Sequence, residues 1–125
     1  MRNLLLSIKA ERGGATAVEF AIVAPAFFLF IIGTMNLGLM LFTMGAMQYA
    51  VEDAARCASV KTTICNTSAA TIAYAKSRYF SPLVKTTFSY STPSCGKKVT
   101  ATATYSFLSG DSRTSVPLSA SNCYP

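Results

Sequence analysis

Histidine and tryptophan are both missing from this 125-residue chain, and acidic residues are few. Five Asp and Glu residues stand against 11 Lys and Arg, and Asp111 is the only acid after residue 58. General acid–base and nucleophilic catalysis need a titratable group held close to its chemical partner. No such set can be assembled from this inventory, so we expect no enzymatic activity and no cofactor.

Basic residues are in excess, which gives a formal net charge of +6, but they are dispersed along the chain. A nucleic-acid-binding domain normally gathers its Lys and Arg residues on one face or carries a recognisable binding motif. The sequence has neither feature. We therefore expect no nucleic-acid partner.

Charge is also absent from a long internal stretch. The 32 residues between Glu19 and Glu52 are all uncharged, whereas about 20 apolar residues are enough to cross a bilayer. We expect one long helix over residues 15–58 that is in contact with membrane lipid from about residue 20 to 44. The apolar region of a secretory signal peptide is only about 7–15 residues long, which is too short to match. An uncleaved signal anchor remains an alternative explanation of the span.

The residues on either side of this span indicate its orientation. The basic residues before it are Arg2, Lys9 and Arg12. Positive residues in a short flank stay on the cytoplasmic side. All four cysteines follow the span, which suits an oxidising periplasmic compartment. They lack the close pairs of a structural zinc site, so we expect no bound metal.

Two disulfides are the better interpretation of these cysteines. Four cysteines allow three connectivities. We favour Cys57–Cys65, which is local, together with Cys95–Cys123, which would tie the end of the chain to a predicted turn.

Several residues of the predicted helix mark positions of contact. Pro25 removes one backbone donor and should kink the helix, and Asn36 would favour a hydrogen-bonding helix partner. Further along, alanine recurs at every fourth position and so stacks along one face of the helix. These alanines are Ala46, Ala50, Ala54 and Ala58. Small residues with this spacing let a second helix approach closely, as in membrane helix pairs.

The remaining residues, 59–125, have the pattern of a small domain that begins with a second helix. Asn66-Thr67-Ser68 is suited to cap a helix over about residues 68–79. Pro82 would end this helix because proline cannot donate the next backbone hydrogen bond.

Strands are expected after this helix. Apolar and polar residues alternate with a period of two over residues 84–90 and 99–107, which predicts two half-buried strands. Pro93-Ser94-Cys95-Gly96 has the composition of a turn between them. Residues 112–119 would add a third strand, confined to an edge by Pro117. The predicted fold class is α+β, with a long N-terminal transmembrane helix packed with a small antiparallel sheet domain.

A lone carboxylate, Glu19, stands at the start of the charge-free stretch, five residues after Gly14. The sequence around it reads Arg12-Gly13-Gly14-Ala15-Thr16-Ala17-Val18-Glu19-Phe20-Ala21-Ile22-Val23-Ala24-Pro25. It resembles the cleavage region of type IV pilins, and is most similar to the TadE-like minor pilins (pseudopilins) of tight-adherence (Tad/Flp, type IVc) pili. Glu52-Asp53-Ala54-Ala55-Arg56 also looks like the segment that follows the span in this family. The resemblance covers about residues 12–58.

This resemblance implies a type IV pilin-like fold in which residues 1–14 are a cytoplasmic basic leader, cut between Gly14 and Ala15 by a prepilin peptidase. It implies a minor pilin that takes part in Tad/Flp pilus biogenesis, adhesion or surface attachment. Its partners would be other pilins or pseudopilins and an inner-membrane assembly platform. The expected location is the bacterial inner membrane, with a periplasmic C-terminal domain, and the extracellular pilus after assembly. An unprocessed single-span assembly or scaffold protein of the same machine is the alternative.

Two roles are open for Glu19. In a growing filament, its carboxylate would pair with the new amine of Ala15 on a neighbouring subunit, and a desolvated charge pair of this kind is costly to break. Alternatively, Glu19 snorkels to the membrane interface and complements the positive end of its own helix, which contributes about 0.3–1 kcal/mol. The resemblance favours the first role.

Overall fold

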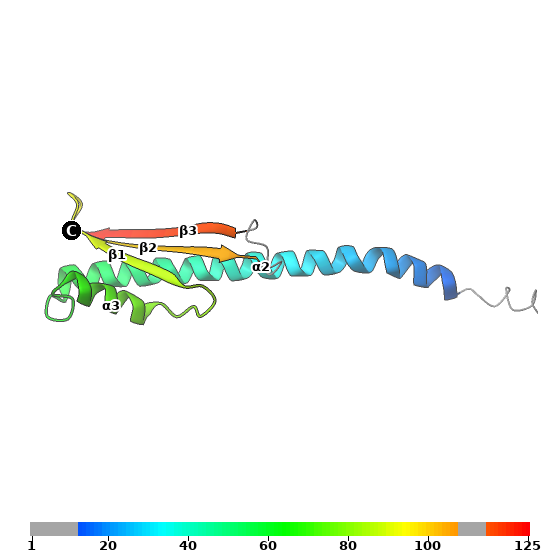
Figure 1. Ribbon diagram of the computed structural model, residues 1–125, viewed down its shortest axis with the longest axis horizontal. Helices are drawn as coiled ribbons and strands as arrows, with labels where there is room; N and C mark the ends of the chain where they lie inside the picture. The colour runs from blue at the N-terminus through cyan, green and yellow to red at the C-terminus, as the bar shows by residue number, and fades with distance from the viewer. Residues whose placement is uncertain (1–12, 108–114) are drawn as a thin grey trace, which may run out of the picture. The chain divides into compact units, whose positions relative to one another are not determined.

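The computed structural model describes residues 13–107 and 115–125 (Figure 1). Its elements, in chain order, are helix α2 (Gly13–Val60), helix α3 (Ser68–Arg78), strand β1 (Thr86–Ser91), strand β2 (Lys97–Ser106) and strand β3 (Ser115–Tyr124). A long apolar helix thus precedes a small antiparallel sheet of three strands. The α+β class expected from the sequence is confirmed.

The chain divides into two compact units, Met1–Met35 and Asn36–Pro125. Helix α2 contributes to both, and its assigned helical residues continue through Pro25 without interruption. The second unit therefore includes the later half of α2. From the sequence we had expected the small domain to begin only after the helix, at residue 59. In this unit α2 supplies one wall of the core, in agreement with the expectation that the long helix packs with the sheet domain.

Helix α3 begins and ends close to the predicted positions. The side chain of Thr67 accepts a hydrogen bond from the Ala70 amide at 3.1 Å, which satisfies one of the free donors of the first turn. The helix ends at Arg78, and Tyr79 adopts an extended conformation. The stop thus comes four residues before Pro82, the residue that the sequence had suggested as the terminator.

The three strands form one antiparallel sheet with the order β1-β2-β3. The register places Phe88 of β1 opposite Ala101 of β2, and Ala101 opposite Ala120 of β3. These side chains lie on the buried face, while the opposite face is mostly Ser and Thr. The third strand lies later than predicted and pairs with the full length of β2. Residues 112–114 of the predicted strand are outside the described part of the chain.

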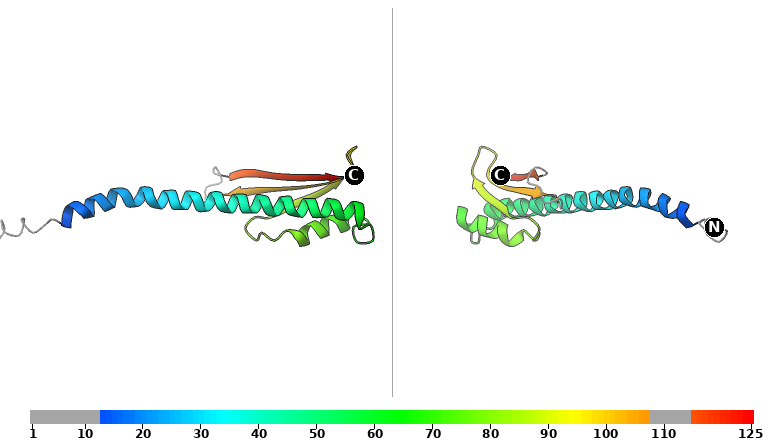
Figure 2. Two further views of the ribbon diagram at one scale, coloured as in Figure 1. Left: turned by 180° about the vertical axis from the view of Figure 1, so that it is seen from behind. Right: turned by 45° about the vertical axis from the view of Figure 1, so that its right-hand side comes forward.

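The sheet and α3 lie on different sides of the later half of α2, as the two views in Figure 2 show. The core that they share is lined by Met47, Ala50, Val51, Ala54 and Ala55 of α2. From the sheet come Phe88, Val99, Ala101, Tyr105, Leu118 and Ala120, and α3 adds Ala75. Burial of these apolar side chains stabilises the unit by roughly 25 cal/mol per Å² of surface removed from water.

Two disulfides connect the segments of the second unit. Cys57 is bonded to Cys65, and Cys95 to Cys123, with Cα–Cα distances of 5.8 and 6.2 Å. This is the pairing that the sequence favoured. Each bond contributes about 2–4 kcal/mol by restricting the unfolded chain. Such a contribution matters because a domain this small buries a limited core.

The turn between β1 and β2 requires a glycine. Gly96 has a φ of +117°, and its amide donates to the Pro93 carbonyl at 3.0 Å. A Cβ at this position would run into the backbone of Tyr124 and Pro125. Both the backbone conformation and the close approach of the end of β3 therefore exclude a side chain.

We predict that Gly96→Ala destabilises the second unit by about 1–3 kcal/mol, because alanine rarely adopts this conformation and its Cβ collides with the backbone. Gly45→Ala is the matched control, since this helical glycine has open space around it. Alanine should stabilise the helix there by about 0.5–1 kcal/mol. Chemical unfolding of the full chain in detergent, followed by the near-ultraviolet circular dichroism of tyrosine, measures both. Equal stability of G96A and the native chain would contradict the argument.

Candidate functional site

The predicted cleavage junction lies within the first turns of α2. Gly14 is exposed, and Glu19 is also exposed on the same helix. A side chain built at Gly14 would meet nothing within 4 Å. The described part of the chain therefore does not cover Gly14. Cleavage and the pairing of Glu19 with Ala15 both stay predictions.

The apolar side chains after Glu19 face outward in the first unit. Those that are more than half exposed include Phe20, Ile22, Val23, Phe27, Phe28, Leu29 and Phe30. By its length and composition, α2 is able to cross a membrane, with a mean hydropathy of 2.1 in its most apolar window and none of that window buried. A helix that is apolar on every side belongs in lipid or against other apolar helices.

Asn36 has a different environment from the one that the sequence suggested. The residue is only 5% exposed, and its backbone carbonyl accepts a hydrogen bond from the Tyr105 hydroxyl at 3.3 Å. Thr43 is also buried, and its hydroxyl donates to the Leu39 carbonyl at 2.9 Å. The fold of the chain itself thus covers these polar groups. The side of α2 that carries Asn36 and Thr43 is packed against protein from Asn36 onward. Both residues lie within the stretch of 20–44 that the sequence predicted to span the membrane.

The face of α2 that carries every fourth alanine is used inside the chain. Ala46, Ala50, Ala54 and Ala58 are all at most 4% exposed. Ala50 and Ala54 belong to the core shared with the sheet, and Ala58 packs with the Cys57–Cys65 disulfide. This face of α2 is therefore covered within the second unit, and its use in packing between helices, for which the spacing is suited, stays a prediction.

A polar network fastens α3 to α2. The Tyr74 hydroxyl donates to Oδ2 of Asp53 at 3.0 Å and accepts from Nη2 of Arg78 at 2.7 Å. Nε of Arg78 also pairs with the same Asp53 oxygen at 2.9 Å. The hydrogen bond that Arg78 donates to the Tyr74 hydroxyl and the electrostatic interaction with Tyr74, followed by the nearby Asp53 carboxylate, raise the pKa of Arg78. Asp53 thus has two partners on α3, which makes it a structural group.

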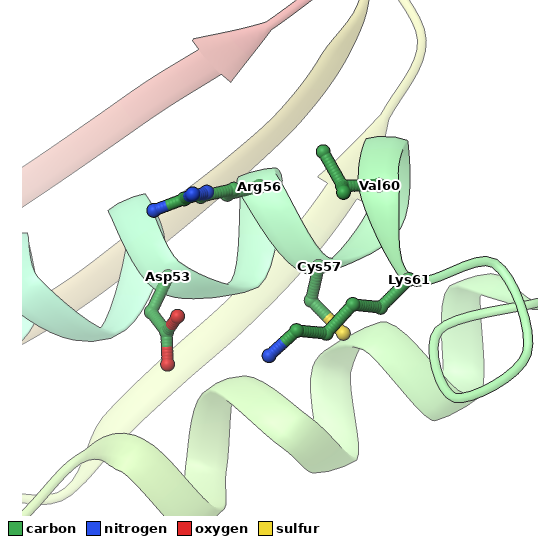
Figure 3. A pocket seen from close by; sticks show the side chains of 5 residues that line it. All are labelled: Asp53, Arg56, Cys57, Val60 and Lys61. Carbon is green, nitrogen blue, oxygen red and sulfur yellow. The ribbon is translucent and has the colours of Figure 1, made fainter.

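The hollow beside this network is small. It is lined by Asp53, Arg56, Cys57, Val60 and Lys61 and has a volume of about 170 Å³. Figure 3 shows Asp53, Cys57 and Lys61 directed toward α3, and Val60 directed away from it. Small-molecule sites usually have a volume of roughly 300–1,000 Å³ and a mostly apolar lining. The volume of this hollow is well below that range.

Metal ligation has no support in the described residues. No group of three or more Cys, Asp or Glu residues there is placed to hold an ion. All four cysteines are in disulfides, so no thiolate is available.

Two features of the second unit had no signal in the sequence. One is the network of Asp53, Tyr74 and Arg78, in which Tyr74 and Arg78 follow Asp53 by 21 and 25 residues along the chain. The other is a group of exposed aromatic rings formed by Phe42, Tyr49 and Phe80. Both depend on how α3 returns along α2, and that path is set by tertiary packing.

A protein-family model described as "TadE-like protein" matches residues 14–56. The resemblance to the TadE-like family is thereby confirmed over this segment, and it points to involvement in the Tad pilus system. No curated protein and no solved structure matches the chain. The match ends inside the second unit, before α3 and the sheet.

We predict that Tyr74→Phe lowers the free energy of unfolding of the second unit by about 1 kcal/mol, because the hydroxyl links Asp53 to Arg78. Tyr90→Phe is the matched control, since the Tyr90 side chain is also half-buried and makes no hydrogen bond within the described residues. Urea unfolding of both full-length variants checks the difference. Loss of similar size in Y90F would mean that the network adds nothing specific.

Proposed function

We propose that this chain is a membrane-anchored minor pilin, or pseudopilin, that takes part in Tad/Flp pilus biogenesis, adhesion or surface attachment. The observation that carries the proposal is the TadE-like match over residues 14–56. That segment begins at the proposed cleavage glycine, includes Glu19 and continues through the exposed apolar part of α2. A prepilin peptidase, other pilins or pseudopilins and an inner-membrane assembly platform are the partners that this role requires.

The proposed anchor is the stretch of α2 before the second unit. From Thr16 to Met35 the side chains are exposed or, at Ala24 and Ile31, half-buried. At 1.5 Å per residue this stretch is about 30 Å long, which equals the thickness of the hydrocarbon core. Removing this surface from water requires lipid or the apolar helices of other subunits. Both environments occur on the route from the membrane into a filament.

Charge and redox chemistry support an N-terminus in the cytoplasm and a second unit in the periplasm. The basic residues Arg2, Lys9 and Arg12 precede the anchor, as expected for a cytoplasmic flank. Both disulfides lie after it, and such bonds persist in the oxidising periplasm. Exposure of the second unit to that compartment would follow from this orientation.

The role we propose is structural and not enzymatic. Asp53, an acid that borders one of the hollows, is engaged by Tyr74 and Arg78. A group held in this way is poorly placed to accept a proton from a substrate. The alternative within the same machine is an unprocessed single-span scaffold protein. The identity of the mature N-terminus separates the two roles.

We predict that a prepilin peptidase cuts the chain between Gly14 and Ala15. The basis is the position of Glu19, the fifth residue after Gly14, together with the basic leader. The intact mass of the protein from cells with and without the peptidase tests this, and loss of residues 1–14 should occur only with the enzyme. Identical masses from both cells would support the unprocessed scaffold instead.

We also predict that Glu19→Gln is inserted and cleaved normally but does not enter filaments. The substitution keeps the shape of the side chain and removes the charge that would pair with the amine of Ala15 on a neighbouring subunit. Glu52→Gln is the matched control, because Glu52 is an exposed glutamate of the same helix beyond the apolar run. Co-purification of each processed variant with sheared pili is the measurement. If E19Q enters pili as well as the native protein does, Glu19 instead lies at the membrane interface and complements the positive end of its own helix.

A further inference from the structure

The loop between α3 and β1 holds two apolar side chains away from the core. The Tyr79 hydroxyl donates to the Val84 carbonyl at 3.0 Å, and the Tyr79 ring meets Phe88 edge-on with centroids 6.0 Å apart. Ser81, which lies between Tyr79 and Val84 along the chain, is buried. Phe80 and Leu83, in contrast, are 58% and 50% exposed. The loop is thus anchored from inside while these two side chains face outward.

Phe80 meets α2 through two further exposed rings. Its centroid lies 5.6 Å from that of Phe42 and 6.1 Å from that of Tyr49, in edge-to-face arrangements. Phe42 and Tyr49 remain 47% and 51% exposed. We call Phe42, Tyr49, Phe80 and Leu83 the apolar patch. Exposed apolar groups gathered in this way usually mark an interaction surface.

The apolar patch extends along α2. Leu37, Leu41 and Met44 are also exposed, although Asn36 and Thr43 on another side of the same helix are buried. One side of α2 is therefore covered by the fold while another side stays apolar and open. Within the second unit, the apolar patch and this side of α2 thus form one exposed apolar area.

The loop lies at the end of the second unit where the chain enters it. Leu83 and Lys85 border a hollow that also includes Leu39 and Tyr105. Tyr105 in turn bonds to Asn36, the first residue of the unit. Figures 1 and 2 show the loop running beyond α3 beside α2. If the preceding stretch spans the bilayer, this end of the unit is the one nearest the membrane surface.

We infer that the apolar patch rests in the interfacial layer of the bilayer and docks the second unit on a phospholipid surface, an inference that depends on the membrane anchor proposed above. Aromatic rings gather at this level of membrane proteins because one part of the interface is apolar and the other is wet. Lys85 is exposed beside Leu83, where its ammonium group can reach lipid phosphates. Continuity with the apolar side of α2 favours lipid over a second copy of the chain.

The absence of tryptophan makes the test direct, because each introduced tryptophan is the only one in its protein. We would place the full-length Phe80→Trp variant as a single copy per nanodisc, in bilayers of phosphatidylcholine and phosphatidylglycerol. Lipids brominated at a shallow or a deep position of the acyl chain then quench nearby tryptophan emission. Ile64→Trp is the matched control, because Ile64 is 56% exposed and lies beyond the other end of α2. Leu29→Trp reports on the anchor itself.

We expect shallow bromines to cause a loss of emission from F80W, deep bromines to cause a loss from L29W, and neither to quench I64W. Quenching of L29W with F80W as bright as I64W would overturn the docking and leave the anchor standing. A bright L29W would overturn both. A different result would assign the patch to a second copy of the chain and overturn the lipid contact. In that case the emission of F80W would be blue-shifted only in discs that hold two copies, and shallow bromines would not quench it.

A second tryptophan variant controls for the case in which Phe80→Trp itself disturbs the aromatic contacts of the patch. Leu83→Trp keeps the contacts of Phe80 with Phe42 and Tyr49 and should show the same loss with shallow bromines. Mapping of the Cys57–Cys65 and Cys95–Cys123 bonds in each variant verifies the fold. Emission from L83W that matches I64W in a correctly bonded protein would count against the docking as firmly as a bright F80W.

Discussion

The second unit depends on the close approach of its sheet to the later half of α2. Small side chains at Ala50, Ala54 and Ala55 let Phe88 and Tyr105 fill the space between helix and sheet. The three strands expose a hydroxyl-rich face on their other side, and residues 13–107 and 115–125 contain no second sheet to pack against them. Without α2 the apolar face of the sheet would lose its partner. The folded unit is therefore Asn36–Pro125, helix included.

The two ends of this unit are held by different kinds of interaction. At the end where α2 stops, the Cys57–Cys65 bond closes the helix exit and the Ser59 hydroxyl donates to the Tyr124 carbonyl at 3.2 Å. The Cys95–Cys123 bond joins the β1–β2 turn to the same end of β3 (Figure 1). At the Asn36 end, a hydrogen bond and aromatic contacts take over. Covalent constraint is thus concentrated at the end of the second unit where α2 stops.

Much of the fold could be predicted from the sequence because its signals are local. Period-two alternation identified β1 and β2, and the polar residues before Ser68 identified the start of α3. The third strand was placed too early, since its register follows from pairing with β2 and from the bond at Cys123. The alanine spacing predicted a face of close packing on the helix, and in the structure this face is buried within the second unit. A spacing shows that something packs closely there and does not say what.

The same distinction applies to the candidate site. Gly14 and Glu19 carry a motif that can be read without coordinates, and the TadE-like match includes both. The apolar patch could not be found this way, because Phe42 and Phe80 meet only after α3 has returned along α2. An exposed phenylalanine also has no sequence pattern that distinguishes it from a buried one. Exposure is a property of the folded unit as a whole.

The length of the sheet explains where the covered part of α2 begins. A strand of 10 residues such as β2 extends about 33 Å, and the helix from Asn36 to Ser59 extends about 35 Å. The two contacts that mark these limits are Tyr105 with Asn36, and Tyr124 with Ser59. Strand and helix are therefore matched in length within the second unit. The contacts at the two limits lie within this unit, so the sheet and the later half of α2 fold as one body from Asn36 onward.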